Sequence, residues 1–388
     1  MNIYKIKDIV SFQNGFAFNS KDMGPTGTNI IKIKEVKNNK ITITESTQKI
    51  SNYDYDSMKK YLVNYNDILI ALTGDPTNKG SEESWVGRTA IYREKECALL
   101  NQRMCKIIPN TKYILPKYLY YYLISYPTLY TLASSAKGSA NQANISHKDV
   151  GELDISLPSI EMQQHIVDII GSLDDKIESN NKLLEKCYIF LNLNMKKLLI
   201  GKDKKIISSF DDIEIISSGI DKFNSSKIYL DTSCVSDNSI VDISNKVTYT
   251  DRPSRANMKP IKNSVWFAKL KSSPKHIIVK DYSDEILDNC IFSTGFLGIK
   301  IDNLKFNLLS TYFTSDVFEK EKDSLSIGAT MQSINNVTFK GMYIPDFSPT
   351  DYIIFNNLSE PILKLIYETE LENIKLQQLK LNYLTKFF

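Results

Sequence analysis

One segment decides the architecture of this chain: residues 166–198 read IVDIIGSLDDKIESNNKLLEKCYIFLNLNMKKL. Its apolar residues recur at alternating spacings of four and three, which is the heptad pattern of a coiled-coil seam. Ser159 precedes the segment where a helix N-cap is favoured, and Gly201 follows it where a C-cap glycine belongs. The segment therefore predicts a helix of about 40 residues, roughly 60 Å long.

A second helical segment ends the chain, over residues 349–388, with a less regular pattern. Pro361 is expected to kink or restart this helix near Ser359. Thr369 and Glu372 interrupt its apolar spacing. Because the first helix leads away from one globular region and the second begins at another, the two are predicted to pair antiparallel. The predicted seam comprises Ile170, Leu173, Ile177, Leu184, Leu191, Leu376 and Leu379.

The rest of the chain contains an internal repeat. Sequence echoes occur in the same order at nearly one offset. They pair residues 95–110 with 288–303, 118–125 with 307–314, 138–145 with 328–335, and 155–158 with 344–347. Alternating apolar runs at 30–36, 40–44 and 67–72, and at 227–230 and 264–270, read as strands.

The predicted fold class is α+β, with two similar globular domains joined by two long antiparallel coiled-coil helices in a pseudo-two-fold repeat. The predicted globular domains are residues 1–157 and 202–348, and the predicted helices are 158–201 and 349–388. Such a molecule suits a ligand with two separated parts, and DNA half-sites are the obvious candidate.

Composition indicates an ordinary soluble protein, with 42% hydrophobic and 24% charged residues and a net charge of only +3. Any positive charge that binds nucleic acid must therefore be local. The five cysteines and three histidines lack the spacing of a metal site, so no metal is expected and the cysteines read as structural thiols. Without a signal-peptide core or a run of about 18 apolar residues, a cytoplasmic location away from membranes is expected.

Motifs of catalysis are also missing from the sequence. There is no GxxxxGK(S/T) loop for ATP, and Asp75-Pro76-Thr77 lacks the second proline and the aromatic residue of an amino-methyltransferase motif. Asp22 with Glu35 and Lys37 could be forced into a nuclease-like set, but Glu35 and Lys37 are expected to point outward from a strand as solvated charges. The sequence predicts no catalytic residue and no cofactor in this chain.

The duplicated layout and three local features resemble the specificity subunits of type I restriction–modification enzymes. The features are NDILIALTGD at 66–75, GSANQANI at 138–145 leading to Leu157-Pro158, and Gln163-Gln164-x-Ile166 at the start of the long helix. The second copy departs from this pattern at 269–272, which lacks the glycine-containing turn, and at 346–349, which replaces Leu-Pro.

The resemblance implies two target-recognition domains, each reading one half of a split double-stranded DNA sequence. It implies helices that dock two modification (methyltransferase) subunits, which use S-adenosylmethionine to methylate adenine N6. It also implies restriction subunits that use ATP and Mg²⁺ for translocation and cleavage. All of this chemistry would lie in the partner subunits.

Reading DNA requires Arg, Lys, Asn or Gln side chains on loops that reach a groove, with other cations on phosphates. Residues 120–122, three tyrosines, are assigned to helix packing instead. Two other functions stay open: a stand-alone nucleic-acid-modifying enzyme, and a coiled-coil scaffold that binds only proteins. The candidate DNA contacts are Lys79, Arg88, Lys137, Asn141 and Gln142 in the first copy, and Arg252, Arg255, Lys269, Lys271 and Lys275 in the second.

Overall fold

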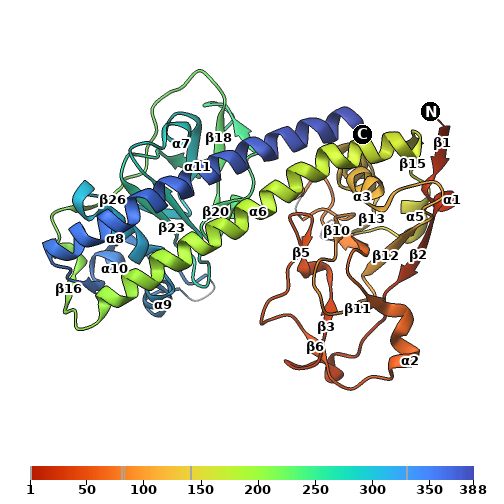
Figure 1. Cartoon of the computed structure of the whole chain (residues 1–388), viewed down its shortest axis with the longest axis horizontal. Coiled ribbons are helices and arrows are strands. Elements are labelled where there is room, and N and C mark those ends of the chain that lie inside the picture. Colours follow the sequence, from red (N-terminus) through yellow and green to blue (C-terminus); the bar gives the residue numbers. More distant parts are fainter. Residues whose placement is uncertain (1, 80–81, 83, 140–141, 329–330) are drawn as a thin grey trace. The chain divides into compact units, whose positions relative to one another are not determined.

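The computed structural model of the protein describes residues 2–79, 82, 84–139, 142–328 and 331–388. It divides into two compact units. Unit 1 comprises Met1–Asp174 with Leu379–Phe388, and unit 2 comprises Asp175–Gln378. The long helices α6 (Ile160–Leu199) and α11 (Pro349–Phe387) each contribute residues to both units (Figure 1).

Unit 1 is built on a six-stranded sheet in the order β2-β12-β8-β10-β5-β4, beside a four-stranded sheet in the order β6-β3-β11-β7. Smaller sheets are formed by β13-β14-β9 and by β1-β15. The strands are β1 (Asn2–Lys5), β2 (Val10–Asn14), β3 (Thr28–Ile31), β4 (Val36–Lys37), β5 (Lys40–Ile41), β6 (Lys49–Ile50), β7 (Leu62–Val63), β8 (Ile68–Ala71), β9 (Thr73–Gly74), β10 (Thr89–Ile91), β11 (Ala98–Leu100), β12 (Met104–Pro109), β13 (Lys137–Ser139), β14 (Gln142–Asn144) and β15 (Asp154–Leu157). The α-helices are α1 (Ile6–Ile9), α2 (Tyr55–Met58), α3 (Pro116–Ile124), α4 (Tyr126–Ser135) and α5 (His147–Gly151).

Unit 2 has two four-stranded sheets, ordered β17-β26-β23-β24 and β21-β18-β25-β22, with the pairs β16-β27 and β19-β20. The strands are β16 (Lys204–Ile206), β17 (Ile213–Ile215), β18 (Lys227–Leu230), β19 (Val235–Ser236), β20 (Ser239–Ile240), β21 (Lys246–Val247), β22 (Ala256–Met258), β23 (Ser264–Ala268), β24 (His276–Val279), β25 (Cys290–Ser293), β26 (Phe296–Ile301) and β27 (Tyr343–Pro345). The α-helices are α7 (Asp284–Asn289), α8 (Asn303–Phe313), α9 (Asp316–Ser324) and α10 (Asn336–Lys340).

The two units repeat one order of elements. β8 lies between β12 and β10, as β23 lies between β26 and β24. β3 pairs in parallel with β11, as β18 does with β25. The helix pairs α3–α4 and α8–α9 follow β12 and β26, and each copy closes with a short strand before its long helix. The sequence echoes therefore correspond to equivalent structural elements.

The start of α6 is fixed by local hydrogen bonds. Ser159 Oγ accepts from the Met162 amide at 3.3 Å, which confirms it as the N-cap, and Gly201 after the helix has φ +72° as a C-cap glycine requires. Gln163 is fully buried: its Oε1 accepts from the Leu115 amide at 2.9 Å, and its Nε2 donates to the Tyr113 carbonyl at 3.0 Å. The helix is thereby tied to the segment before α3.

The buried face of α6 follows the heptad positions. Ile170, Ile177, Leu184 and Leu191 are buried, and Leu173 is half-buried. Near the end of the helix the buried position moves to Met195, while Asn194 and Leu198 are half-buried.

The predicted seam of α11 is wrong by about one residue. Leu379 is 41% exposed and Leu376 is half-buried. The buried apolar side chains of α11 are Tyr352, Phe355, Leu363, Ile366 and Leu384. Thr369 and Asn373 belong to the buried stripe. The restart expected at Pro361 does not occur, because α11 runs through it as one helix.

Within unit 2 the two helices run antiparallel. Asn180 on α6 bonds to Asn373 on α11, whereas Tyr188, further along α6, bonds to Glu370, which comes earlier on α11. Within unit 1, Asp174 on α6 accepts from Lys380 on α11 at 2.6 Å, and Ile170 shares a hydrophobic cluster with Leu384.

Two strand predictions need correction near residue 35. The strand expected at 30–36 ends at Ile31 and is followed by a 3-10 turn at Ile33–Glu35, and the one expected at 40–44 ends at Ile41. Glu35 is buried, not solvated, because its Oε2 accepts from the Lys32 amide at 3.1 Å and its other oxygen faces Lys34. The tyrosines at 120–122 are buried, as expected for helix packing.

Candidate nucleic-acid interface

The predicted DNA-contacting residues gather around one equivalent place in each unit. In unit 1, β9 pairs with β14, and β14 pairs with β13, with Ser139 opposite Gln142. In unit 2, Ser333 forms bridges with both Leu270 and Ile327. In unit 1, the segment after β8 is therefore paired with the segment before α5. In unit 2, the segment after β23 is paired in the same way with the segment before α10.

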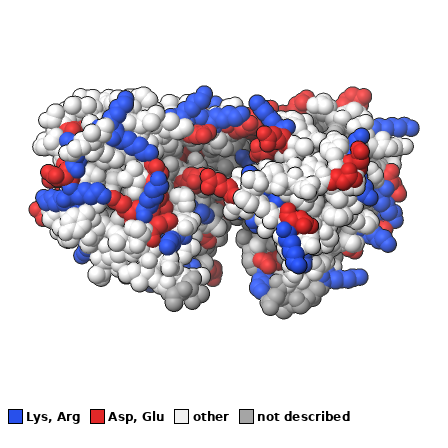
Figure 2. Space-filling view, turned by 90° about the horizontal axis from the view of Figure 1, so that it is seen from below, with Lys and Arg blue, Asp and Glu red and all other residues white. Residues whose placement is uncertain are grey.

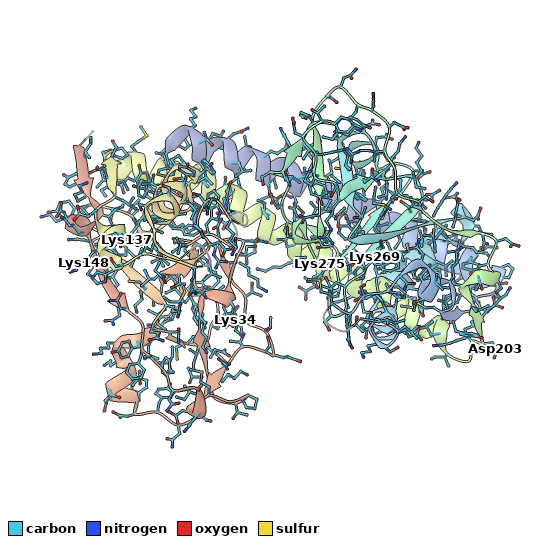
Figure 3. All side chains as sticks on the ribbon, turned by 180° about the vertical axis from the view of Figure 1, so that it is seen from behind. Lys34, Lys137, Lys148, Asp203, Lys269 and Lys275 are labelled. Atoms are coloured by element: carbon cyan, nitrogen blue, oxygen red, sulfur yellow. The ribbon has the colours of Figure 1, made fainter. Side chains whose placement is uncertain are left out.

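Three of the unit 1 candidates are exposed at this place. Lys137 on β13 and Gln142 on β14 are exposed, and Lys79 is exposed in the turn after β9. Lys137 lies close enough to Asp149 to help lower the pKa of that carboxyl, after the larger effect of hydrogen bonds from Ser146. Lys137 and Lys148 are both labelled in unit 1 in Figure 3. Asn141 lies outside the described residues.

Arg88 has a structural role that the sequence did not indicate. Its Nε donates to the Trp85 carbonyl and its Nη1 to the Val36 carbonyl, both at 3.1 Å. The guanidinium thus joins the segment before β10 to β4, and it is only partly exposed. Its position favours holding the sheet together over contacting DNA.

In unit 2 the lysines of the basic loop, residues 269–275, donate to groups on other segments of the same unit. Lys269 Nζ donates to the Thr294 carbonyl at 3.0 Å, Lys271 Nζ to Gln332 Oε1 at 2.8 Å, and Lys275 Nζ to the Thr232 carbonyl. Burial lowers the pKa of Lys269, and the nearby Arg255 guanidinium lowers it further. Lys269 and Lys275 lie on neighbouring segments, because the Ala268 amide donates to the Lys275 carbonyl (Figure 3).

A buried lysine on α9 contacts the backbone of the basic loop. Lys322 on α9 is 0% exposed, and its Nζ donates to the carbonyls of Ala268 at 3.1 Å and Ser273 at 3.3 Å. The same ammonium pairs with Glu319 Oε2 at 2.7 Å, and Glu319 Oε1 contacts the ring of His276 at 3.0 Å. A buried cation with three oxygen partners can hold the two ends of the loop in place.

Arg252 and Arg255 differ in their surroundings. Arg252 Nη1 donates to the Ala256 carbonyl at 2.8 Å, and its guanidinium lies 5.0 Å from the centre of the Tyr249 ring. Arg252 therefore contacts the loop that carries it, through the Ala256 carbonyl and the Tyr249 ring. Arg255 is exposed, and its carbonyl accepts from the Thr294 amide at 2.8 Å, so it lies beside the turn that Lys269 contacts.

Charge is mixed over the surface. Figure 2 shows Lys and Arg side chains interspersed with Asp and Glu on both units, with no single basic field on the visible face. Among the described residues, no group of three or more His, Cys, Asp or Glu side chains could hold a metal ion. Burial raises the pKa of the Cys105, Cys234 and Cys290 thiols to about 12, so these thiols stay protonated at neutral pH. No helix in the described ranges is long and apolar enough to cross a membrane.

Comparison with known proteins shows what the first part of the chain is similar to. Residues 1–187 match the family model described as the type I restriction modification DNA specificity domain. The chain is 28% identical over 232 residues to the MjaX type I restriction enzyme specificity subunit of Methanocaldococcus jannaschii, covering 57% of this chain and 52% of that protein. It is 36% identical over 88 residues to the HindI specificity subunit of Haemophilus influenzae, covering 22% of this chain and 19% of that one. The first part of the chain therefore resembles type I restriction–modification specificity subunits.

A solved structure shares the fold of this chain. The S subunit of a type I restriction–modification system from M. genitalium superimposes with a TM-score of 0.54 at 14% identity, covering 100% of this chain and 96% of that one. The match to the MjaX protein spans about half of that protein's length, and the match to HindI spans less.

Two structural residues of this chain were missed in the sequence. Lys322 stands in FEKEKDS (318–324), which resembles a solvated helix, and only the side chains that surround it reveal its burial. Gln163 was noted as part of a motif, but its three hydrogen bonds to backbone groups could not be read from its spacing.

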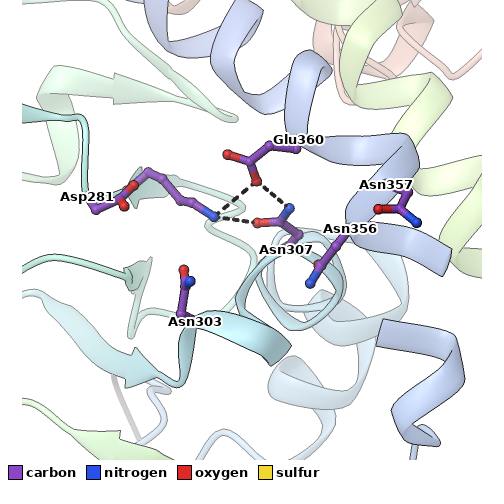
Figure 4. Close-up of a pocket in the computed structure, with 7 residues that line it drawn as sticks. Asp281, Asn303, Asn307, Asn356, Asn357 and Glu360 are labelled. Carbon is purple, nitrogen blue, oxygen red and sulfur yellow. Dashed lines mark hydrogen bonds and ion pairs between the residues drawn. The ribbon is translucent and has the colours of Figure 1, made fainter. Parts of the chain in front are cut away.

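A polar pocket of about 390 Å³ lies in unit 2 between α8 and α11 (Figure 4). Lys280 Nζ donates to Asn307 Oδ1 at 2.8 Å and pairs with Glu360 Oε2 at 3.2 Å, while Asn307 Nδ2 donates to Glu360 at 2.8 Å. These three side chains satisfy one another, so the pocket wall is a closed polar network that ties α8 to α11.

Proposed function

We propose that this chain is the specificity subunit of a type I restriction–modification complex and recognises a bipartite double-stranded DNA sequence, with one target-recognition domain in residues 1–157 and the other in 202–348. The observation that carries the proposal is the repeated frame around β9–β14 and Leu270–Ser333. Equivalent backbone positions carry different polar side chains in the two copies, as two domains that read different sequences require.

The proposal extends to the long helices at 158–201 and 349–388, which would pair as an antiparallel coiled coil and dock two modification subunits. An exposed apolar stripe on α6 supports this docking role: Leu183, Phe190 and Leu193 are 38%, 43% and 56% exposed. Exposed apolar side chains that share one helix face are typical of a protein-binding surface.

The proposal places the catalytic steps in the modification and restriction subunits. S-adenosylmethionine would bind the modification subunits, and ATP and Mg²⁺ the restriction subunits, with no cofactor in this chain. The complex would act on DNA in the cytoplasm.

The test is co-expression with the modification subunits of the same system, followed by sequencing for N6-methyladenine. The expected result is methylation confined to one split sequence, and exchange of residues 202–348 for those of another family member should change only one half of it. A stand-alone modifying enzyme would methylate or cleave DNA as the purified chain. A protein-only scaffold would show no salt-sensitive DNA binding even in the assembled complex.

A further inference from the structure

The two units place one equivalent turn beside the predicted DNA-contacting segments. In unit 1 the Leu72 amide donates to the Arg103 carbonyl at 2.9 Å, and the Leu72 carbonyl accepts from the Ile145 amide at 3.0 Å. In unit 2 the Lys269 amide donates to the Gly295 carbonyl at 2.9 Å, and the Lys269 carbonyl accepts from the Ile334 amide at 2.9 Å. The β11–β12 turn at 101–103 is therefore the structural counterpart of the β25–β26 turn at 293–295.

The backbone of the β11–β12 turn is held rigidly. The Phe16 amide donates to the Leu100 carbonyl at 2.8 Å, and the Gln102 amide donates back to the Phe16 carbonyl at 2.9 Å. Gly15 makes this close approach possible, since a Cβ there would lie 2.0 Å from the Asn101 oxygen. Asn101 is itself buried, and its carbonyl accepts from the Met104 amide at 2.8 Å.

This rigid turn carries two exposed side chains, Gln102 and Arg103. Within the described residues, neither the Gln102 amide nor the Arg103 guanidinium makes a hydrogen bond or ion pair with another side chain. Arginine bonds in bidentate fashion to the O6 and N7 edge of guanine, and glutamine does so to the N6 and N7 edge of adenine. Side chains of this kind on a fixed backbone are suited to reading bases, because little ordering is needed on binding.

The counterpart turn carries different chemistry. Thr294 has a short side chain and Gly295 has none, and the cations beside that turn, Lys269 and Arg255, come from neighbouring segments. The two copies thus present different donor and acceptor groups from one backbone frame.

We infer that Gln102 and Arg103 read base edges in the major groove of the half-site bound by the first target-recognition domain, with Arg103 on a guanine and Gln102 on an adenine. This inference rests on the proposed function. It adds two residues that the sequence analysis did not single out, and it gives the β11–β12 turn a role in sequence specificity.

The experiment compares Arg103→Ala and Gln102→Ala with wild type in the complex with its modification subunits. Binding to a library of duplexes randomised within both half-sites is measured at two salt concentrations. Each variant is expected to lose about ten-fold or more of its discrimination at one base pair of one half-site, and to keep its preferences in the other half. Arg103→Lys should fail to restore discrimination, because an ammonium cannot make the bidentate contact.

Lys95→Ala is the matched control, since Lys95 is an exposed cation between β10 and β11. It should leave every base preference unchanged. If Arg103→Ala weakens binding to all duplexes equally and lowers the salt slope by about one, Arg103 is a phosphate contact and the inference is overturned. Wild-type preferences in both variants would also overturn it and leave the proposed function standing. A wild-type complex that shows no sequence preference would instead overturn the proposed function.

Discussion

Asn180 on α6 donates a hydrogen bond from Nδ2 to Oδ1 of Asn373 on α11, across 3.0 Å. Both side chains are buried, and the Asn373 amide in turn donates to Asn181 Oδ1 at 3.0 Å. A polar pair at buried positions of two helices is satisfied in one register only, because a shift places each amide against apolar groups. This pair therefore specifies how α6 and α11 align within unit 2.

Asn180→Ala should lower the free energy of unfolding by about 1–3 kcal/mol, because Asn373 loses a buried hydrogen-bond partner. The double variant Asn180→Leu, Asn373→Leu should recover much of that loss and allow other registers, visible as weaker hydrogen-exchange protection in both helices. Urea unfolding measures the first effect. Asn194→Ala is the control, since the hydrogen bonds of the Asn194 side chain within the described residues stay in its own helix, to the Phe190 carbonyl and from Lys197 Nζ. Equal stability of Asn180→Ala and wild type would contradict the register role.

Ile177→Asp and Leu379→Asp test which helix faces are buried. Ile177 is 9% exposed, so a carboxylate there would be desolvated without a partner and should cost several kcal/mol. Leu379 is 41% exposed, so the same substitution there should change stability by about 0.5 kcal/mol or less. Thermal unfolding of the two variants gives the comparison. Similar losses for both would mean that the assignment of the exposed face of α11 is wrong.

The contrast between the two long helices shows what the sequence could predict. In α6 most buried positions are apolar, so the heptad spacing located the buried face correctly from Ile166 to Leu191. In α11, Ser359, Thr369 and Asn373 occupy buried positions. A pattern of apolar residues alone therefore predicts a stripe displaced by one residue, and this stripe includes the exposed Leu379.

The candidate site shows a similar limit. Composition and loop position singled out cations near equivalent segments of the two units, but they could not separate a solvated cation from one bonded to backbone carbonyls. Arg88 and Arg252 are both bonded in this way, through contacts as distant in sequence as Val36. The burial of Lys322 could not be predicted for the same reason, because the backbone carbonyls that it contacts lie on the loop at 268–273.

Glu370 should make stability depend on pH. Burial raises the pKa of this carboxyl to about 8, although the hydrogen bond from the Tyr188 hydroxyl at 3.2 Å opposes the shift. The folded state then binds a proton more tightly than the unfolded state, whose carboxyl keeps its ordinary value of 4.5. The contribution is complete below the ordinary value and is lost as pH rises through about 8.

Urea unfolding from about pH 6 to about pH 9 should therefore show stability falling with pH in the wild type more steeply than in Glu370→Gln. The difference between the two proteins isolates this group from others that titrate in the same range. Parallel curves for wild type and Glu370→Gln would show that Glu370 is ionised in the folded protein.

The exposed apolar stripe on α6 predicts how partners assemble. Phe190 and Leu193 face solvent, on a helix whose opposite side is buried, so a charge at either position should leave folding intact and prevent a protein from packing there. Phe190→Asp and Leu193→Asp should therefore keep the wild-type melting temperature and lose co-purification with the modification subunits. Leu304→Asp on α8 is the matched control, since Leu304 is 46% exposed and lies outside the long helices. It should retain the partners. If all three variants co-purify like wild type, the modification subunits dock elsewhere, because a desolvated carboxylate at the centre of an apolar contact would weaken it by several kcal/mol.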